Sequence, residues 1–291
     1  MQKVVLIGAN GQLGSELAKI FCNYELVPLT HADLDIADAK EIERLLGQHS
    51  PDLILNTAAY HRVDECEEFP ARAYEVNALA VRHLAQWSKA HQAVLLHFST
   101  DYVFDGCLRR PYTEADPPAP LSAYAVSKLA GEYFIRAIHD RHFIIRTCGL
   151  YGIAGSSGKG GNFVETMLRL ATEGKEIRVV DDQGLTPTSA KELARKLRQL
   201  VETRAYGLYH ITNDGACSWY EFAAAIFELS GLKPRLQPTT SAAFGAHAKR
   251  PAYSVLDNAN LRSLGLDDLR HWRDALKEYL EDRRRSGTQA Q

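Results

Sequence analysis

Short apolar runs alternate with amphipathic segments along the first half of the chain. Apolar, β-branched runs predict strands at 3–7, 26–29, 52–56, 93–99 and 143–147. Apolar residues at helical spacing predict a helix after the first strand and further helices at 39–48, 71–90 and 122–139. This order predicts an α/β fold, a doubly wound parallel sheet of the Rossmann type with right-handed crossovers.

The pattern is less regular after Cys148. Helices are expected at 162–173, 191–203, 219–229 and 269–282, with a strand at 177–180 and an irregular segment at 234–250. Glycines and serines at 152–161 predict a flexible loop that covers or shapes a site. We therefore expect a smaller α/β substrate domain. The predicted division is a dinucleotide-binding domain at 1–147 with a returning segment near 185–215, a substrate-binding domain at 148–184 and 216–285, and a frayed tail at 286–291.

A glycine-rich turn joins the first predicted strand to the first predicted helix. Its glycines are Gly8, Gly11 and Gly14. Gly8 allows a tight turn, Gly11 allows the backbone to approach a pyrophosphate, and Gly14 allows the helix to pack closely on the sheet. The positive end of the helix dipole then faces the phosphates. This strand–turn–helix context predicts a dinucleotide-binding site.

Tyr124 and Lys128 lie four residues apart on a predicted helix, so their side chains project from one face. A lysine ammonium beside a tyrosine favours the phenolate and lowers the tyrosine pKa from about 10. Such a tyrosine can donate or accept a proton near neutral pH. The spacing alone is also typical of a surface lysine beside a packed tyrosine. Downstream of a dinucleotide turn, the pair predicts carbonyl chemistry with a nicotinamide.

Ser99, Thr100, Asp101 and Tyr102 follow the fourth predicted strand. In open parallel sheets, ligands bind outside the carboxyl ends of the strands. A hydroxyl at this edge can hydrogen-bond a carbonyl held between the nicotinamide and Tyr124. The same residue types are also typical of a simple turn.

Composition and charge exclude several partners. The chain has 45% apolar and 24% charged residues, which is ordinary for a globular protein, and a formal net charge of -2. That charge leaves no electrostatic footprint for nucleic acid or an anionic membrane. No stretch approaches the roughly 20 apolar residues that span a bilayer, and the immediate first strand predicts no signal peptide. Five cysteines without a C-x-x-C pair predict reduced thiols and a cytoplasmic location. A homodimer stays open as the assembly.

Four segments are informative in combination. They are the glycine turn at 8–14, Asn56-Thr-Ala-Ala-Tyr60, Ser99-Thr-Asp-Tyr-Val-Phe-Asp-Gly106 and Tyr124-Ala-Val-Ser-Lys128. With Gly161-Asn-Phe163, Asp182-Gln183, Pro187-Thr188 and Lys249-Arg-Pro251, they resemble the extended short-chain dehydrogenase/reductases and, more narrowly, the dTDP-4-dehydrorhamnose reductase family. The resemblance implies NAD(P)H-dependent reduction of the 4-keto group of dTDP-4-dehydro-L-rhamnose to dTDP-L-rhamnose, a nucleotide sugar for surface polysaccharide.

The resemblance also implies residue roles. Tyr124 would protonate the C4 oxygen, Lys128 would bind the nicotinamide ribose and hold down the tyrosine pKa, and Thr100 would hydrogen-bond the carbonyl or phenolic oxygen. The expected cofactor-binding residues are Gly8, Asn10, Gly11, Gln12, Leu13, Thr30, Asp35, Ile36, Ala58, Ala59, Tyr60, Tyr124 and Lys128. The expected substrate-binding residues are Thr100, Asp101, Asn162 and Arg250. The planar fork of Arg250 suits phosphate oxygens, and a surface ion pair is the equally weighted alternative.

The chain departs from the family pattern at two places. Many members carry an aromatic residue after the fifth strand, in an Arg-Thr-x-Trp context that packs on the sugar. Here Gly149 stands at that position, so this platform is absent or is supplied by Tyr151. Some members bind a divalent ion at a dimer interface through acidic residues. Glu16 matches one of these, but Lys191 stands where a second is expected, so we predict no metal.

The residues after the second strand leave the cofactor preference open. An acidic residue there would favour NAD, and an arginine would accept the extra phosphate of NADP. This chain has Thr30, His31 and Ala32. Neutral Thr30 does not repel a 2′-phosphate, which favours NADPH, with NADH as the alternative. Two other functions stay open: a reductase or epimerase of another nucleotide-linked keto sugar, and a non-catalytic NADP-binding regulatory subunit that binds a partner enzyme.

Overall fold

Six strands form the central sheet of the computed structural model, which describes residues 2–154 and 161–288. The strand order is β10-β5-β4-β3-β1-β2, and all neighbouring strands are parallel. The strands are β1 (Lys3–Ile7), β2 (Glu25–Leu29), β3 (Leu53–Asn56), β4 (Val94–Thr100), β5 (His142–Thr147) and β10 (Gly207–His210). Because β2 and β3 pair with opposite edges of β1, a topological switch point lies beside β1. The predicted doubly wound α/β fold is confirmed.

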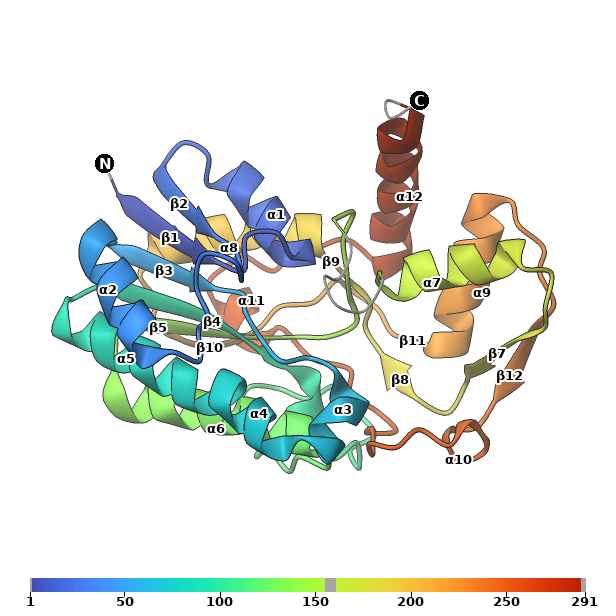
Figure 1. Cartoon of the computed structure of the whole chain (residues 1–291). Coiled ribbons are helices and arrows are strands. Elements are labelled where there is room, and N and C mark those ends of the chain that lie inside the picture. The colour runs from blue at the N-terminus through green and yellow to red at the C-terminus, as the bar shows by residue number, and fades with distance from the viewer. Residues whose placement is uncertain (1, 155–160, 289–291) are drawn as a thin grey trace.

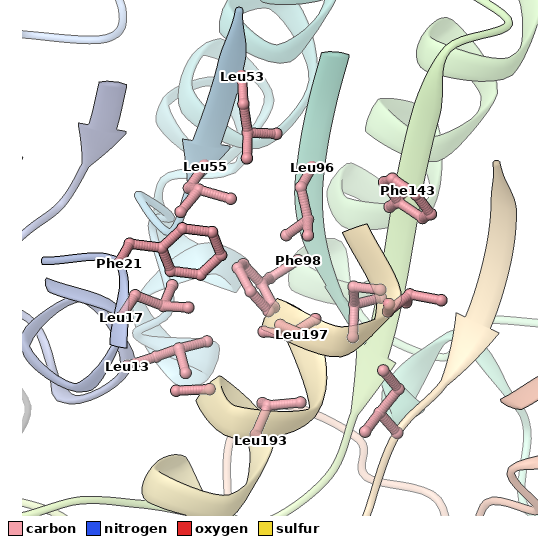
Figure 2. Packing of buried hydrophobic residues seen from close by; sticks show 14 of the residues in the cluster. Leu13, Leu17, Phe21, Leu53, Leu55, Leu96, Phe98, Phe143, Leu193 and Leu197 are labelled. Carbon is pink, nitrogen blue, oxygen red and sulfur yellow. The ribbon is translucent and has the colours of Figure 1, made fainter. Parts of the chain in front are cut away.

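Helices cover both faces of this sheet (Figure 1). One face carries α1 (Gln12–Ile20) and α8 (Ala190–Thr203), and the other carries α2 (Ala39–His49), α5 (Ala80–Ala90) and α6 (Ala123–Ile138). Figure 2 shows how Leu17 of α1 and Leu197 of α8 meet side chains of β3 and β4 in one apolar cluster. Parallel strands buried on both faces read as continuous apolar runs, which is why the sequence predicted β1, β3, β4 and β5; β10, a short strand at the edge of the sheet, was not predicted as a strand.

A second group of elements lies at the right of Figure 1 and has its own apolar core. Its main elements are α7 (Phe163–Thr172), β7 (Ile177–Val180), α9 (Trp219–Ser230), β12 (Leu236–Thr239) and α12 (Trp272–Thr288). Short elements elsewhere in the chain, not all of them in this group, are η2 (Asp101–Val103), β6 (Leu150–Tyr151), β8 (Gly184–Leu185), β9 (Thr188–Ser189), β11 (Cys217–Ser218), α10 (Ser241–Phe244) and α11 (Ala259–Ser263), of which α11 packs against the central sheet. Over the described residues, no helix combines the length and apolarity needed to cross a membrane.

The predicted helix at 71–90 is divided into three pieces. They are α4 (Pro70–Tyr74), a π-helical turn η1 (Glu75–Leu79) and α5, preceded by a short helix α3 (Val63–Glu68) that was not predicted. In the π-helical turn, the Asn77 side chain exchanges hydrogen bonds of 2.9 Å with the backbone N–H and C=O of Tyr60. A Cβ at Gly131 of α6 would lie 2.4 Å from the Asn77 carbonyl oxygen. Close packing on α6 and anchoring of the Tyr60 loop therefore accompany the widened turn, which is typical of functional sites.

Three other expectations differ from the structure. The segment 234–250 was expected to be irregular but contains β12 and α10. The strand β12 was not predicted because it is short, half-exposed and lacks an alternating apolar pattern. The last helix was expected to end at Asp282 but continues to Thr288, so the backbone at 286–288 is helical rather than frayed. Most of the predicted loop at 152–161, namely residues 155–160, lies outside the described residues.

Candidate functional site

The glycine turn forms as the sequence predicted. Gly8 has φ +82°, a left-handed conformation that favours glycine, and its N–H donates to the Leu29 carbonyl at 2.8 Å. A Cβ at Gly14 would lie 2.1 Å from the Gly8 carbonyl oxygen, so the close packing of α1 on this turn requires glycine. Within the described chain, no side chain caps α1 at Gly11. The first N–H groups of α1 are therefore available to an anion.

A cavity of about 910 Å³ follows the carboxyl ends of the strands from the glycine turn to α6. Its wall contains every residue that the sequence assigned to cofactor or substrate, with the exception of Arg250. Additional lining residues that sequence reasoning missed include His31, Tyr102, Phe163, Gln183, Trp219 and Ser254. Several of these come from the second group of elements, whose position over the sheet edge depends on long-range packing and leaves no local signal.

Thr100, Tyr124 and Lys128 converge on this cavity. Thr100 is the last residue of β4 and caps η2, where its Oγ1 accepts a hydrogen bond from the Tyr102 N–H at 3.2 Å. Tyr124 is in the first turn of α6, and Lys128 follows one turn later with 2% of its surface exposed. A hydrogen bond also joins the side chains of Thr100 and Tyr124. The predicted groups for carbonyl chemistry thus face one space.

The pKa of Tyr124 is raised above its ordinary value. Burial is the largest cause, the negative charge of Asp101 adds to it, and the hydrogen bond with Thr100 opposes it. Burial lowers the pKa of Lys128 to about 8. The expectation of a lowered Tyr124 pKa is corrected here, because burial and Asp101 outweigh the stabilisation of a phenolate. Tyr124 therefore keeps its proton near neutral pH.

Asp101 lines the cavity, but its carboxylate is engaged by protein donors. Thr100 Oγ1 donates to Oδ1 at 3.1 Å and Cys148 Sγ donates to Oδ2 at 2.9 Å. Burial raises the pKa of Asp101, and hydrogen bonds from Cys148, Ser254 and Thr100 oppose that rise. Asp101 thus holds the Thr100 hydroxyl as well as facing the space where a substrate would lie.

Beneath Lys128 lies a row of buried polar groups. Lys128 Nζ is 3.3 Å from His97 Nε2, and His97 Nδ1 is 3.1 Å from the amide nitrogen of Asn56. Asn56 Oδ1 accepts a hydrogen bond of 3.2 Å from the N–H of Ala58. Burial and the neighbouring Lys128 charge lower the pKa of His97 well below its ordinary value, so the imidazole is neutral. The row connects the reaction centre to the loop after β3.

Asn162 and Arg250 are engaged differently from expectation. Asn162 caps α7, where its Oδ1 accepts from the Glu165 N–H at 3.0 Å and its Nδ2 donates to the Gly152 carbonyl at 2.8 Å. Arg250 pairs with both carboxylate oxygens of Asp64, the shorter contact being 2.8 Å. Arg250 does not line the cavity, so the structure shows the ion pair that the sequence left as an alternative.

Tyr151 does not replace the aromatic platform missing at Gly149. Its side chain is 1% exposed and packs in the second apolar core, where its ring centroid is 5.7 Å from that of Phe222. The cavity wall instead contains Phe163 and Trp219, whose ring centroids are 4.6 Å apart. Trp219 is half-buried, so part of its ring faces the cavity.

The residues after β2 form a turn in which a carboxylate is engaged by the backbone and side chain of Thr30. The Asp33 carboxylate accepts hydrogen bonds from the N–H of Thr30 at 2.8 Å and from its hydroxyl at 2.7 Å. These hydrogen bonds lower the pKa of Asp33. Arg72 lines the same end of the cavity and lies 3.7 Å from Asp35. Asp33 is therefore engaged by its own turn, and the cavity wall carries both the Asp35 carboxylate and the Arg72 guanidinium.

The two positions considered for a metal both take part in ion pairs. Glu16 pairs with Lys19 at 2.7 Å, and Lys191 pairs with Glu278 at 2.6 Å and also with Asp282. The part of the chain that the structure describes contains no group of three or more side chains suited to hold a metal ion. The absence of a metal stays a prediction.

Comparisons with known proteins agree with this geometry. The family model described as RmlD substrate binding domain matches residues 1–285. The chain is 43% identical to the spore coat polysaccharide biosynthesis protein SpsK of Bacillus subtilis, over 97% of this chain and 98% of that protein. It is 41% identical to a dTDP-4-dehydrorhamnose reductase of Streptomyces griseus, over 94% and 91%. A dTDP-4-dehydrorhamnose reductase of Bacillus anthracis, solved in complex with NADP, superposes with a TM-score of 0.92 at 38% identity, over 97% and 99%.

Proposed function

We propose that this chain, which belongs to the RmlD substrate binding domain family, is an NADPH-dependent reductase of the 4-keto group of dTDP-4-dehydro-L-rhamnose. The product is dTDP-L-rhamnose, and NADH is the alternative cofactor. The observation that carries the proposal is the convergence of Thr100, Tyr124 and Lys128 on the cavity that begins at the glycine turn. The similarity to a reductase solved with NADP and to a spore coat polysaccharide protein supports the cofactor and a role in surface polysaccharide.

The glycine turn fits a dinucleotide. The uncapped end of α1 presents N–H groups beside Gly11, where a Cβ would lie 3.3 Å from the Gly8 carbonyl oxygen. When bound, the nicotinamide supplies the hydride that reduces the carbonyl. The residues proposed to hold the cofactor are Gly8, Asn10, Gly11, Gln12, Leu13, Thr30, Asp35, Ile36, Ala58, Ala59, Tyr60, Tyr124 and Lys128.

Side chains of this protein then supply the proton to the carbonyl oxygen. Tyr124 keeps its proton at neutral pH because burial and Asp101 raise its pKa. As the carbonyl oxygen gains negative charge it becomes a stronger base than the phenolate, and Tyr124 donates to it. Thr100, held by Asp101, fixes the direction of that donation. Lys128 holds the ribose side of the nicotinamide.

The substrate-binding residues that we propose are Thr100 and Asp101 at the sugar, with Asn162 and Arg250 toward the nucleotide diphosphate. Asn162 lines the cavity while it caps α7. Arg250 is paired with Asp64, and we propose that a phosphate of the substrate replaces that carboxylate as the partner of the guanidinium.

We also propose the domain division 1–147 with 185–215, against 148–184 and 216–285. The first set supplies the sheet and, apart from Leu261 and its neighbours, the two clusters that cover it, and the second supplies a separate apolar core. No disulfide joins the cysteines of the described residues, which supports a cytoplasmic location. A homodimer is the assembly that we propose to test by light scattering.

The test is NAD(P)H oxidation with enzymatically generated dTDP-4-dehydro-L-rhamnose. We expect Tyr124→Phe to lower kcat by about 10²–10⁴-fold with little change in NADPH affinity, since a general acid contributes that range. Tyr133→Phe, at a tyrosine on the same helix that is 52% exposed, is the matched control and should retain activity. Near-normal turnover by Tyr124→Phe would assign the proton to another group. Turnover of a different keto sugar only, or binding of a partner enzyme without turnover, would replace the proposed substrate.

A further inference from the structure

Asn56 and His97, the buried polar residues beneath Lys128, have no part in the mechanism above. Asn56 and His97 are 0% exposed and Lys128 is 2% exposed. Buried polar groups of this kind must satisfy one another's hydrogen bonds, so donors have to face acceptors. The direction of each hydrogen bond can therefore be worked out from the fixed backbone end of the row.

The backbone fixes the orientation of the Asn56 amide. The N–H of Ala58 can only donate, and it lies 3.2 Å from Asn56 Oδ1, which is therefore the oxygen. The amide nitrogen of Asn56 then faces His97 Nδ1 at 3.1 Å. An amide nitrogen only donates, so Nδ1 must be an acceptor without a proton. A neutral imidazole with a bare Nδ1 carries its proton on Nε2.

This tautomer places an N–H opposite Lys128. His97 Nε2 is 3.3 Å from Lys128 Nζ. An ammonium only donates, so a charged Lys128 would face another donor, whereas a neutral amine accepts the hydrogen bond. We propose that His97 is a positioning residue whose Nε2–H hydrogen-bonds the neutral amine of Lys128 and thereby favours the amine over the ammonium before cofactor binds. The proton arrangement stands by itself, and only its effect on turnover rests on the proposed function.

The surrounding charges leave this arrangement in place. Glu132, one turn beyond Lys128 on α6, is the group whose charge favours the ammonium. Both of its oxygens are engaged by Arg146 of β5, at 2.9 and 2.6 Å, and it also accepts a hydrogen bond from the hydroxyl of Ser99 on β4. The Arg146 guanidinium therefore compensates most of the Glu132 charge, and burial acts on Lys128 in favour of the neutral amine.

A direct test is the tautomer of His97 in the cofactor-free protein. Two-bond nitrogen–proton NMR correlations on histidine labelled with ¹⁵N distinguish a proton on Nε2 from one on Nδ1, and His97→Gln identifies the signal. We expect the Nε2–H form from about pH 6 to pH 9, since the imidazole is buried. An Nδ1–H form, or a doubly protonated ring, would overturn the proposal. This measurement uses no substrate, so its failure is separate from failure of the proposed function.

A second test is the titration of Lys128, followed by ¹³Cε NMR and assigned with Lys128→Met. If His97 donates to the neutral amine, His97→Leu removes that stabilisation and raises the Lys128 pKa by ~0.5–1 unit. If His97 instead accepts from an ammonium, the same change lowers it. A downward shift or no shift therefore refutes the proposal. His142→Leu, at a buried histidine near the start of β5, is the control for losing a core imidazole and should leave Lys128 unchanged.

The catalytic consequence is a shift of the alkaline limb of kcat/KM. In His97→Leu that limb should move upward with the Lys128 pKa, whereas a purely structural defect would lower the rate at all pH values alike. His97→Gln, which keeps an N–H donor of similar reach, should leave the limb where it lies in the wild type. A His97→Leu limb that does not move, with Lys128 titrating as in the wild type, counts against the proposal, and if His97→Leu does not fold the tautomer of His97 decides.

Discussion

Replacing Glu132 with glutamine removes one charge from a buried ion pair without changing the shape of the side chain. The side chains of Arg146 and Glu132 are 2% and 0% exposed, and they make two hydrogen bonds of 2.9 and 2.6 Å. Glutamine leaves the guanidinium buried without its carboxylate. Its remaining partners are the Phe104 ring, 5.2 Å from the guanidinium carbon, and a neutral His210. The expected effect is therefore large.

The magnitude follows from burial and chain length. Removing one partner of a buried pair costs about 3–5 kcal/mol, because the other charge stays desolvated. The unfolding entropy of a 291-residue chain at ~2.1 cal/mol/K per residue is about 0.6 kcal/mol/K. Dividing the two gives an expected decrease in Tm of about 5–8 °C for Glu132→Gln.

Differential scanning calorimetry measures this difference. Glu173→Gln is the control, because its ion pair with Arg169 is exposed and should contribute less than about 1 kcal/mol. Combining Glu132→Gln with Arg146→Met should recover part of the loss, since the uncompensated charge is then removed. A Tm for Glu132→Gln within about 1 °C of the wild type, or no recovery in the double variant, would refute the reasoning.

Two further predictions concern the lysine and the glycine turn. The folded-state pKa of Lys128 is about 8, and its ordinary value is 10.5. Between these two pH values Lys128 is mostly neutral in the folded protein and protonated in the unfolded chain, so the free energy of unfolding rises with pH. Urea unfolding should show the wild type gaining up to about 3 kcal/mol relative to Lys128→Met over that window, and parallel pH curves would contradict this. Gly14→Ala places a Cβ 2.1 Å from the Gly8 carbonyl, so calorimetric titration should show NADPH affinity at least ~10-fold weaker. Gly47→Ala, where a Cβ meets nothing within 4 Å, should bind normally, and equal affinities in both variants would argue against the proposed cradle.

The sequence predicted the parts of the site that follow from local pattern. Apolar runs located the strands, and the ends of those strands located Gly8, Thr100 and the turn after β3. The spacing of Tyr124 and Lys128 placed both on one helix face that borders the cavity. In each case the geometry is set within one strand–turn–helix unit, so the information is contiguous in the chain.

Contacts between distant segments were not predictable in this way. Arg250 meets Asp64 across 186 positions of the sequence, and no local pattern distinguishes that ion pair from a phosphate contact. Trp219 reaches the cavity because α9 packs beside α7, while Tyr151, the aromatic residue nearest in sequence to Gly149, points into the core. Side-chain direction in these places depends on how the second group of elements packs, which is a tertiary property.

The charge state of the reaction centre depends on the same kind of long-range packing. The Tyr-x-x-x-Lys spacing sets where the two side chains stand, but their protonation follows from residues on other strands. Asp101 at the end of β4 raises the Tyr124 pKa, and His97 within β4 contacts Lys128 directly. Two chains with the same spacing can therefore differ in which form of the tyrosine and lysine meets the cofactor. For this chain, a protonated Tyr124 is already in the form that reduction of a ketone requires, and the reverse oxidation would first need the phenol to lose its proton.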